Sequence, residues 1–195
     1  MEQHHFLTTL FPRPKFTAAE QDAVVNRFKP VQFSRNDYLL REGKTATQYW
    51  LLESGFARSY VTDAAGNDIT THFYGPGDIV MDWSSFFLQQ PTRENIQALT
   101  ACQCWQLEYL HFQELFHGIE TFREHGRTNF AASYFTLKSH SIGLIADNAA
   151  ARYKKLLQEK PLLVQNVPVK HMATYLGITD TSLSRIRREL AKESS

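Results

Sequence analysis

Short hydrophobic runs separated by turn residues fill the stretch from residue 31 to residue 107. Turn signals such as Asn36-Asp37, Gly43 and Gly75-Pro76-Gly77 stand between the runs, and these residue types favour tight turns. The runs lie at 31–33, 38–40, 49–52, 56–61, 69–74, 79–80, 96–99 and 102–107. Runs of this length and spacing predict short antiparallel strands that fold into a roll or barrel.

Helical patterns stand on both sides of these strands. Thr17-Ala18-Ala19-Glu20 is a capping box, in which the Thr and Glu side chains satisfy free amides at a helix start. After Glu108 the pattern becomes helical, and Pro161 is predicted to end a helical stretch that contains residues 148–158. An apolar seam with spacings of four, three and seven lies on one face of this long helical segment: Phe130, Tyr134, Leu137 and Leu144.

That seam needs a surface to pack against. The surface is either the chain's own roll or the same helix of a second copy, and we favour the second copy because of the segment that follows.

Residues 169–188 have the pattern of a helix-turn-helix. Ala173 is small, as helix crossing requires, and Gly177 falls where a tight turn favours a positive φ. Thr179 is the predicted N-cap of the second helix, and Asp180 in its first turn suits the helix dipole. Apolar residues stand where two short crossing helices bury side chains: Met172, Leu176, Ile178, Leu183 and Ile186.

The second helix of such a motif lies in the major groove of DNA and presents its early residues to base edges. On the exposed face we expect Asp180, Thr181, Arg185 and Arg188 to contact DNA, with Arg185 the first choice for a bidentate guanine contact. Phosphate contacts are expected from Lys170, Ser182 and Ser184. In the alternative interpretation the arginines only solvate a helix end, where cations suit the dipole. Asp180 would repel phosphate unless it accepts from cytosine N4 or holds a neighbouring side chain.

The charge distribution supports a polyanionic partner for the end of the chain. The 195 residues contain 21 Lys and Arg and 20 Asp and Glu, a net charge of +1. Residues 151–195 hold nine Lys or Arg and four acids, which gives +5 there and −4 in the first 150 residues. A basic tail on an otherwise acidic chain indicates nucleic acid as the partner of the tail.

Composition argues against several other classes. Cys102 and Cys104 are too few for a disulfide framework or a four-cysteine metal site, and we expect them to pack in the core. No Walker A loop, nucleophile elbow or dinucleotide fingerprint occurs, so an enzyme is not expected. No run approaches the roughly 20 apolar residues of a membrane-spanning helix, so we expect a cytoplasmic protein with no membrane partner.

The order of roll, long helix and helix-turn-helix resembles the CRP/FNR superfamily of bacterial transcription regulators, relatives of the catabolite activator protein. The matching landmarks are residues 49–55 (YWLLESG) followed by 56–58 (FAR), and residues 73–78 (FYGPGD). The tail from Arg152 to Arg187 looks like the branch of the family found in Bacteroidetes. The resemblance covers nearly all of the chain.

The resemblance implies an α+β fold in three parts. The first is an antiparallel β-roll (a double-stranded β-helix or jelly roll) of the cyclic-nucleotide-binding type, the sensor, at residues 1–110. A dimerisation helix or linker at 111–145 and a DNA-binding helix-turn-helix domain at 146–195 follow. The last domain would be winged-helix-like, with the wing reduced or absent.

The resemblance also locates a sensor site, and there this sequence departs from the family. Cyclic-nucleotide binders have a Gly-Glu pair and an Arg-Ser-Ala or Arg-Thr-Ala step that hold the cyclic phosphate and ribose. Here the two positions read Met81-Asp82 and Arg93-Glu94-Asn95. A carboxylate about 4 Å from a phosphate costs roughly 1 to 4 kcal/mol. We therefore expect cAMP to bind weakly or not at all, and we expect no cofactor.

Two interpretations of Arg93 remain open. In one, Arg93 neutralises Glu94 or Asp82 in an ion pair. In the other, a rebuilt pocket binds a different small anionic effector and is lined by Asp82, Trp83, Ser84, Ser85 and Arg93.

The sequence as a whole predicts a homodimeric regulator that binds a pseudo-palindromic operator in double-stranded DNA, with half-sites about 34 Å apart. RNA polymerase is a further expected partner. The alternative, from a different class, is a ligand-binding sensor module whose helix-turn-helix is vestigial or binds protein.

Overall fold

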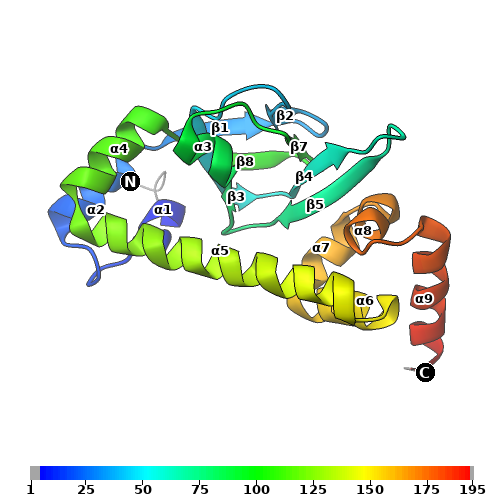
Figure 1. Cartoon of the computed structure of the whole chain (residues 1–195). Coiled ribbons are helices and arrows are strands. Elements are labelled where there is room, and N and C mark those ends of the chain that lie inside the picture. Colours follow the sequence, from blue (N-terminus) through cyan, green and yellow to red (C-terminus); the bar gives the residue numbers. More distant parts are fainter. Residues whose placement is uncertain (1–4, 194–195) are drawn as a thin grey trace. The chain divides into compact units, whose positions relative to one another are not determined.

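The computed structural model describes residues 5–193 and has the predicted α+β fold (Figure 1). Its residues fall into two compact units. Among the described residues, the first comprises residues 5–57 and 74–133, and the second comprises residues 58–73 and 134–193. The predicted domain boundaries at residues 110 and 145 stay a prediction.

The first unit contains a four-stranded antiparallel sheet in the order β1-β8-β3-β6. These strands are β1 (Lys29–Phe33), β8 (Cys102–Glu108), β3 (Gln48–Ser54) and β6 (Ile79–Val80). In addition, β2 (Tyr38–Leu40) pairs with β7 (Asn95–Ala98). The hydrophobic runs predicted these strands to within two residues at each end, because tight turns bound them on both sides.

Helices α1 (His5–Leu10), α2 (Ala18–Val25), α3 (Trp83–Leu88) and α4 (Tyr109–Gly118) complete the first unit, together with the start of α5 (Glu120–Ala146). The predicted capping box is confirmed: Thr17 accepts from the Glu20 amide, and the Thr17 amide donates to Glu20 Oε2 at 2.9 Å. The helical segment after Glu108 is broken at Ile119, whose φ of −125° is extended and separates α4 from α5.

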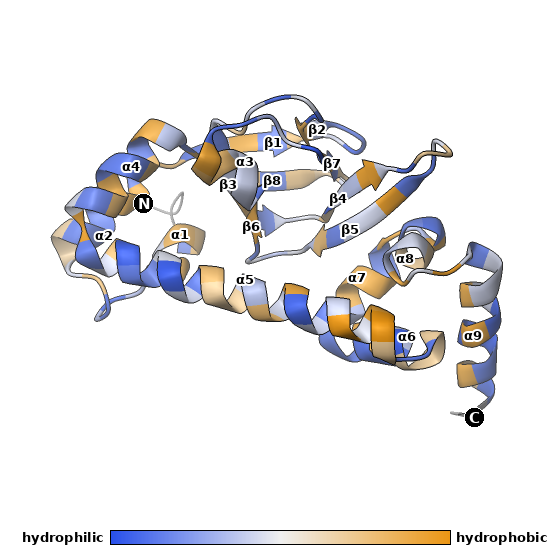
Figure 2. Cartoon of the chain, viewed as in Figure 1, coloured by the Kyte–Doolittle hydropathy of each residue, from blue (hydrophilic) through white to orange (hydrophobic). Residues whose placement is uncertain are grey.

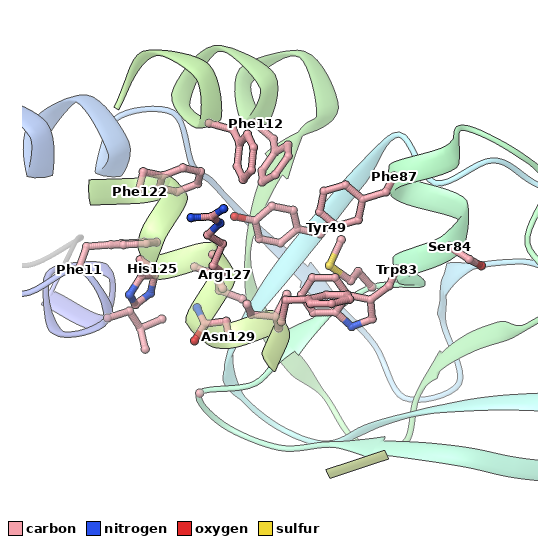
Figure 3. A pocket seen from close by; sticks show the side chains of 18 of the residues that line it. Phe11, Tyr49, Trp83, Ser84, Phe87, Phe112, Phe122, His125, Arg127 and Asn129 are labelled. Carbon is pink, nitrogen blue, oxygen red and sulfur yellow. The ribbon is translucent and has the colours of Figure 1, made fainter. Parts of the chain in front are cut away.

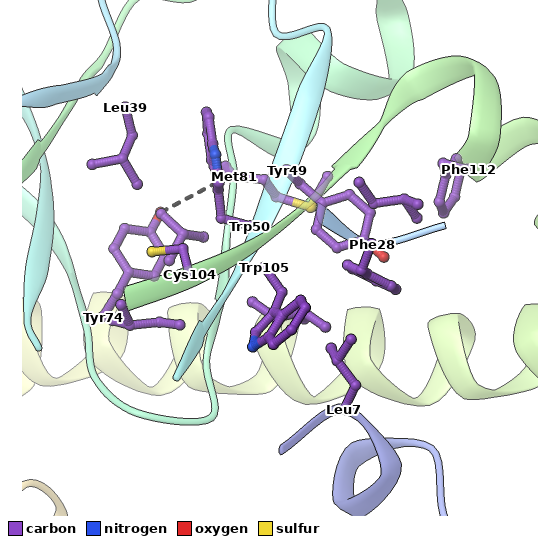
Figure 4. Close-up of a cluster of buried hydrophobic side chains, with 14 of the residues drawn as sticks. Leu7, Phe28, Leu39, Tyr49, Trp50, Tyr74, Met81, Cys104, Trp105 and Phe112 are labelled. Atoms are coloured by element: carbon purple, nitrogen blue, oxygen red, sulfur yellow. Dashed lines mark hydrogen bonds between the residues drawn. The ribbon is translucent and has the colours of Figure 1, made fainter. Parts of the chain in front are cut away.

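Alternate residues of β3 point to opposite faces of its sheet (Figure 4). On one face Trp50 lies near Leu39 and Tyr74, and on the other Tyr49 contacts Phe28 and Phe112 at ring distances of 6.0 and 6.1 Å. Strand β3 is therefore buried on both sides, and it supplies both halves of the core of this unit.

The two cysteines belong to that core, as predicted. Both Cys102 and Cys104 are buried. Burial, with a smaller contribution from Cys102, raises the pKa of the Cys104 thiol to about 12. A thiol that stays protonated at neutral pH is a packing group and a poor nucleophile.

The second unit joins strands β4 (Ala57–Thr62) and β5 (Asp68–Tyr74), which are neighbours in a sheet, to the C-terminal helices. These are α6 (Ala149–Glu159), α7 (Pro161–Asn166), α8 (Val169–Tyr175) and α9 (Asp180–Glu193), preceded by the end of α5. Helix α6 ends before Pro161 as predicted. Pro161 is also the first residue of α7, a position where its missing N–H costs nothing.

Helix α5 carries the apolar seam that the sequence predicts, and Figure 2 shows hydrophobic residues alternating with hydrophilic ones along it. About half of each seam side chain is exposed, from 43% at Leu144 to 58% at Leu137. Within residues 5–193, no helix is long and apolar enough to cross a membrane.

Candidate functional site

The second unit contains the predicted helix-turn-helix as helices α8 and α9. Met172, Leu176 and Leu183 are at most 1% exposed, so the apolar positions chosen from the sequence lie between the two helices. Gly177 forms the turn with a φ of +67°, a conformation that costs little only for glycine.

Thr179 caps α9 as predicted. Its Oγ1 accepts a hydrogen bond from the Ser182 amide at 3.2 Å, and its hydroxyl donates to Ser182 Oγ at 3.0 Å. The hydroxyl of Ser182 is therefore engaged at the start of the helix, and the orientation of α9 is fixed locally.

The exposed face of α9 carries the side chains proposed for DNA contact. Asp180, Thr181, Ser184, Arg185 and Arg188 are all exposed, and Ser182 is half-buried. Arg185 Nε lies 3.9 Å from Glu189, and both side chains are more than 60% exposed, so this ion pair is weak. Lys170 is exposed at the start of α8. The structure thus brings the α9 residues together on one helix and places Lys170 on the preceding one.

Helix α8 is held against other parts of the second unit. Thr174 Oγ1 accepts from the Thr70 amide of β5 at 3.2 Å. The ring of Tyr175 lies 5.1 Å from Phe73 and stacks on His140 at 4.0 Å. These contacts fix the first helix of the motif and leave the outer face of α9 in solvent.

His171 lies on α8 in this packed environment. Its pKa is lowered to about 4, chiefly by burial and then by Arg58 and Lys170, while Asp68 acts in the opposite direction. The side chain is therefore neutral at pH 7, and it adds no positive charge to this surface.

The predicted sensor residues lie in the first unit, around α3. Asp82 is the N-cap of this helix: its Oδ1 accepts from the amides of Ser84 at 2.9 Å and Ser85 at 3.2 Å. Its Oδ2 accepts from the buried hydroxyl of Thr92. Ser85 is also fully occupied, since its hydroxyl donates to Gln90 O and accepts from the Ala46 amide.

Arg93 lies apart from these groups. It is exposed, and no ion pair joins it to Asp82 in the part of the chain that the structure describes. Met81, only 4% exposed, places its side chain in the core. The loop between β6 and β7 is thus held together by its own hydrogen bonds.

A cavity of about 680 Å³ lies in the first unit on the Tyr49 face of β3 (Figure 3). Of the predicted sensor residues, Trp83 and Ser84 line it, and Asp82, Ser85 and Arg93 do not. Most of its walls come from residues that the sequence did not single out as a site. They stand on β3, α3, α4 and α5, and include Tyr49, Phe87, Phe112, Phe122 and Phe130. The only available signal was the density of aromatic residues on the helices after residue 108.

No group of His, Cys, Asp and Glu side chains within residues 5–193 could hold a metal ion.

Known families and structures match this architecture. Residues 30–118 match the family described as Cyclic nucleotide-binding domain. FixK2 from Bradyrhizobium japonicum is 16% identical, with a TM-score of 0.74 and 86% of each chain covered. CLP from Xanthomonas campestris, described as a c-di-GMP-responsive global regulator, is 13% identical with a TM-score of 0.71, covering 91% of this chain and 93% of that one.

A further structure carries the family description itself. A putative transcriptional regulator of the CRP/FNR family from Eubacterium rectale is 14% identical with a TM-score of 0.72, covering 95% of this chain and 88% of that one. No curated protein sequence matches the chain.

The family match begins in β1 and ends at the last residue of α4. The chain shares the fold of these solved regulators, as the resemblance to the CRP/FNR superfamily predicted. Its place in the Bacteroidetes branch stays a prediction.

Proposed function

We propose that this protein is a sequence-specific DNA-binding transcription regulator that acts as a homodimer on a pseudo-palindromic operator. The observation that carries the proposal is helix α9, which is capped by Thr179, packed on α8 through Leu183, and basic on its solvent face at Arg185 and Arg188. A capped amphipathic helix with exposed arginines is the form of element that enters a major groove.

Each residue has a proposed role. Arg185 donates both arms of its guanidinium to guanine O6 and N7, because its ionic partner Glu189 is weakly bound at 3.9 Å and is easily exchanged. Asp180, Thr181 and Arg188 contact bases or adjacent phosphates. Phosphate contacts come from Lys170 and Ser184. Ser182 adds a third, because its hydroxyl oxygen accepts from Thr179 but its own hydroxyl proton can still be donated.

The homodimer is proposed to form along α5. Exposed apolar side chains at Phe130, Tyr134, Leu137 and Leu144 give this helix a seam, and large exposed apolar patches mark interaction surfaces. A cytoplasmic location and contact with RNA polymerase belong to the same proposal.

The regulator is proposed to work without cAMP. Met81 and Asp82 stand where the family's Gly-Glu pair would be, and Asp82 already uses both oxygens within the loop. An anionic ligand at Arg93 would lie beside Glu94. Isothermal calorimetry with cAMP tests this, and micromolar binding by the folded protein would refute it.

DNA binding is tested by selecting a duplex from random sequences and measuring its affinity for the wild-type protein and for Arg185→Ala. Loss of a bidentate guanine contact is expected to weaken binding by about 1–3 kcal/mol, roughly 5- to 150-fold. Arg187→Ala is the matched control, because Arg187 is also exposed on α9 but lies two residues from Arg185 and so on another face. Equal affinities of the two variants would refute the assignment of Arg185. Failure to select any duplex at moderate salt would favour a sensor module without DNA binding.

A further inference from the structure

The cavity of the first unit has the dimensions of a small-molecule site and is separate from the loop that holds Asp82 and Arg93. Its volume of about 680 Å³ lies inside the range of roughly 300–1,000 Å³ in which small ligands bind. Neither Asp82 nor Arg93 lines it. A ligand there would therefore not use the position at which the family's phosphate cassette lies.

The charge of the lining favours a neutral ligand. Arg127 is the one charged residue among the lining residues in the described chain, and its guanidinium pairs with Glu124 at 2.8 Å. His125 also lines the cavity, and burial together with nearby Lys15 lowers its pKa, so it is neutral at pH 7. A charged molecule would lose hydration without gaining a free counter-charge.

Flat aromatic walls favour rings over flexible chains. Trp83 and Phe87 stack at 5.9 Å with an interplanar angle of 7°, and Phe87 meets Phe112 edge-on at 5.6 Å. Phe130 closes on Trp83 from α5 at 5.3 Å, also edge-on. Aromatic pairs gain energy in these stacked and edge-to-face geometries beyond the area that they bury. A rigid ring system also loses less conformational entropy on binding than an acyl chain does.

Tyr49 offers a hydroxyl to the cavity. Tyr49 is 6% exposed, lines the cavity, and makes no hydrogen bond to any residue in 5–193. Figure 3 shows its hydroxyl pointing toward the side of the cavity where Arg127 lies. Burial raises the pKa of this phenol, which keeps its proton in place as a donor. The hydroxyl is therefore open to the cavity and available to donate one hydrogen bond to a polar atom of a ligand.

We infer that this cavity binds a small neutral molecule of fused aromatic rings that carries one hydroxyl or carbonyl group, with the rings packed against the wall formed by Trp83, Phe87 and Phe112 and the polar group on Tyr49. The inference does not depend on DNA binding, and its test uses no DNA.

The test measures the fluorescence anisotropy of 1-hydroxypyrene as the full chain is added to it. In a second step 1-hexadecanol, a flexible alcohol with as many carbon atoms as 1-hydroxypyrene, is added as a competitor. Saturable binding that 1-hexadecanol displaces poorly is expected. Gly126→Leu should weaken the affinity at least about tenfold, because Gly126 lines the cavity and its new side chain would fill it. Gly118→Leu is the matched control, since Gly118 also lies on a helix, does not line the cavity and has nothing within 4 Å of an added Cβ.

Tyr49→Phe tests the polar contact and does not depend on the folding of the Gly126 variant. It should weaken 1-hydroxypyrene by about two- to tenfold, the value of one hydrogen bond, and leave pyrene unchanged. Three results would overturn the inference: no binding by the folded wild type, equal affinity in Gly126→Leu, or displacement by 1-hexadecanol as readily as by pyrene. An anisotropy that first rises and then falls again at high protein concentration would also overturn the inference. Such a fall would mean that a second copy of the chain displaces the probe from the cavity.

Discussion

Replacing Asp82 by Ala should lower the stability of the first unit, and this effect does not require a bound ligand. Asp82 Oδ1 accepts from two amides at the start of α3, and loss of an N-cap costs about 1 kcal/mol. Oδ2 accepts from Thr92, which is 3% exposed, and a buried hydroxyl that loses its partner costs about another 1 kcal/mol. The expected loss in the free energy of unfolding is therefore about 2 kcal/mol.

Urea unfolding followed by tryptophan emission measures this loss. All three tryptophans, Trp50, Trp83 and Trp105, belong to the first unit, so the signal reports on the unit that contains Asp82. With a slope of about 2 kcal/mol per molar urea, the midpoint should fall by about 1 M. Asp82→Asn should recover about half of the loss, because its amide oxygen still caps α3 while its amide nitrogen cannot accept from Thr92.

Arg93→Ala is the control, since an exposed side chain outside any ion pair with Asp82 should change stability by no more than about 0.5 kcal/mol. An unchanged midpoint in Asp82→Ala would refute the capping argument and return Asp82 to the role of a residue kept for a ligand. A midpoint for Asp82→Asn as low as that for Ala would show that the carboxylate charge, and not the cap geometry, matters.

Three further predictions concern other parts of the chain. Gly55→Ala should cost more than about 2 kcal/mol in thermal unfolding, because φ is +95° and the new Cβ would lie 2.3 Å from Ala101 O; Gly66→Ala, at φ +83° in open space, should cost about 1 kcal/mol. Thr179→Ala should lower the hydrogen-exchange protection of α9 by about 1 kcal/mol, whereas Thr179→Ser should not, and equal protection in both would contradict the cap. Stability should fall as the pH drops from 6.5 to about 4, because His171 takes up a proton in the unfolded chain more readily than in the folded protein. The urea midpoint should therefore fall less steeply with pH in His171→Gln than in the wild type. The same dependence of the midpoint on pH in both proteins would refute this role.

Most of the fold could be predicted from the sequence because its elements are marked at both ends. Thr17 and Glu20 mark one helix start, and Gly177 with Thr179 marks the turn of the C-terminal motif. Such local signals depend on backbone chemistry alone, so they can be recognised in the sequence without knowledge of tertiary contacts. The strands were equally clear, because each short run is bounded by residues that stop it.

Helices α1, α3 and α7 were not predicted. Each has six residues, fewer than two turns, so no periodicity can develop within it. Asp82 before Trp83 is a capping signal for α3, but it was interpreted from the sequence either as an ion-pair partner of Arg93 or as part of a ligand pocket. Pro161 was interpreted only as a stop, although proline also suits the first turn of a helix.

The cavity was beyond sequence analysis for a different reason. Its walls join residues far apart in the chain, such as Tyr49, Phe112 and Phe130, and aromatic residues at helical spacing are equally consistent with a filled core. Whether the space between them is occupied depends on packing at the scale of single side chains. The DNA-contact residues were easier to select, because they follow from a motif of about twenty consecutive residues. Their contacts with DNA remain a prediction.

Helix α5 has a consequence for how such a chain can change over evolution or be re-engineered. Its 27 residues extend about 40 Å and pass from one compact unit to the other, with the boundary at residues 133 and 134 inside the helix. A loop absorbs an inserted residue, but a helix does not: each residue added to α5 turns everything beyond it by about 100° and advances it by about 1.5 Å. Deletions and chimaeric junctions in this segment should therefore be tolerated in steps of seven residues, close to two full turns, and poorly at lengths between.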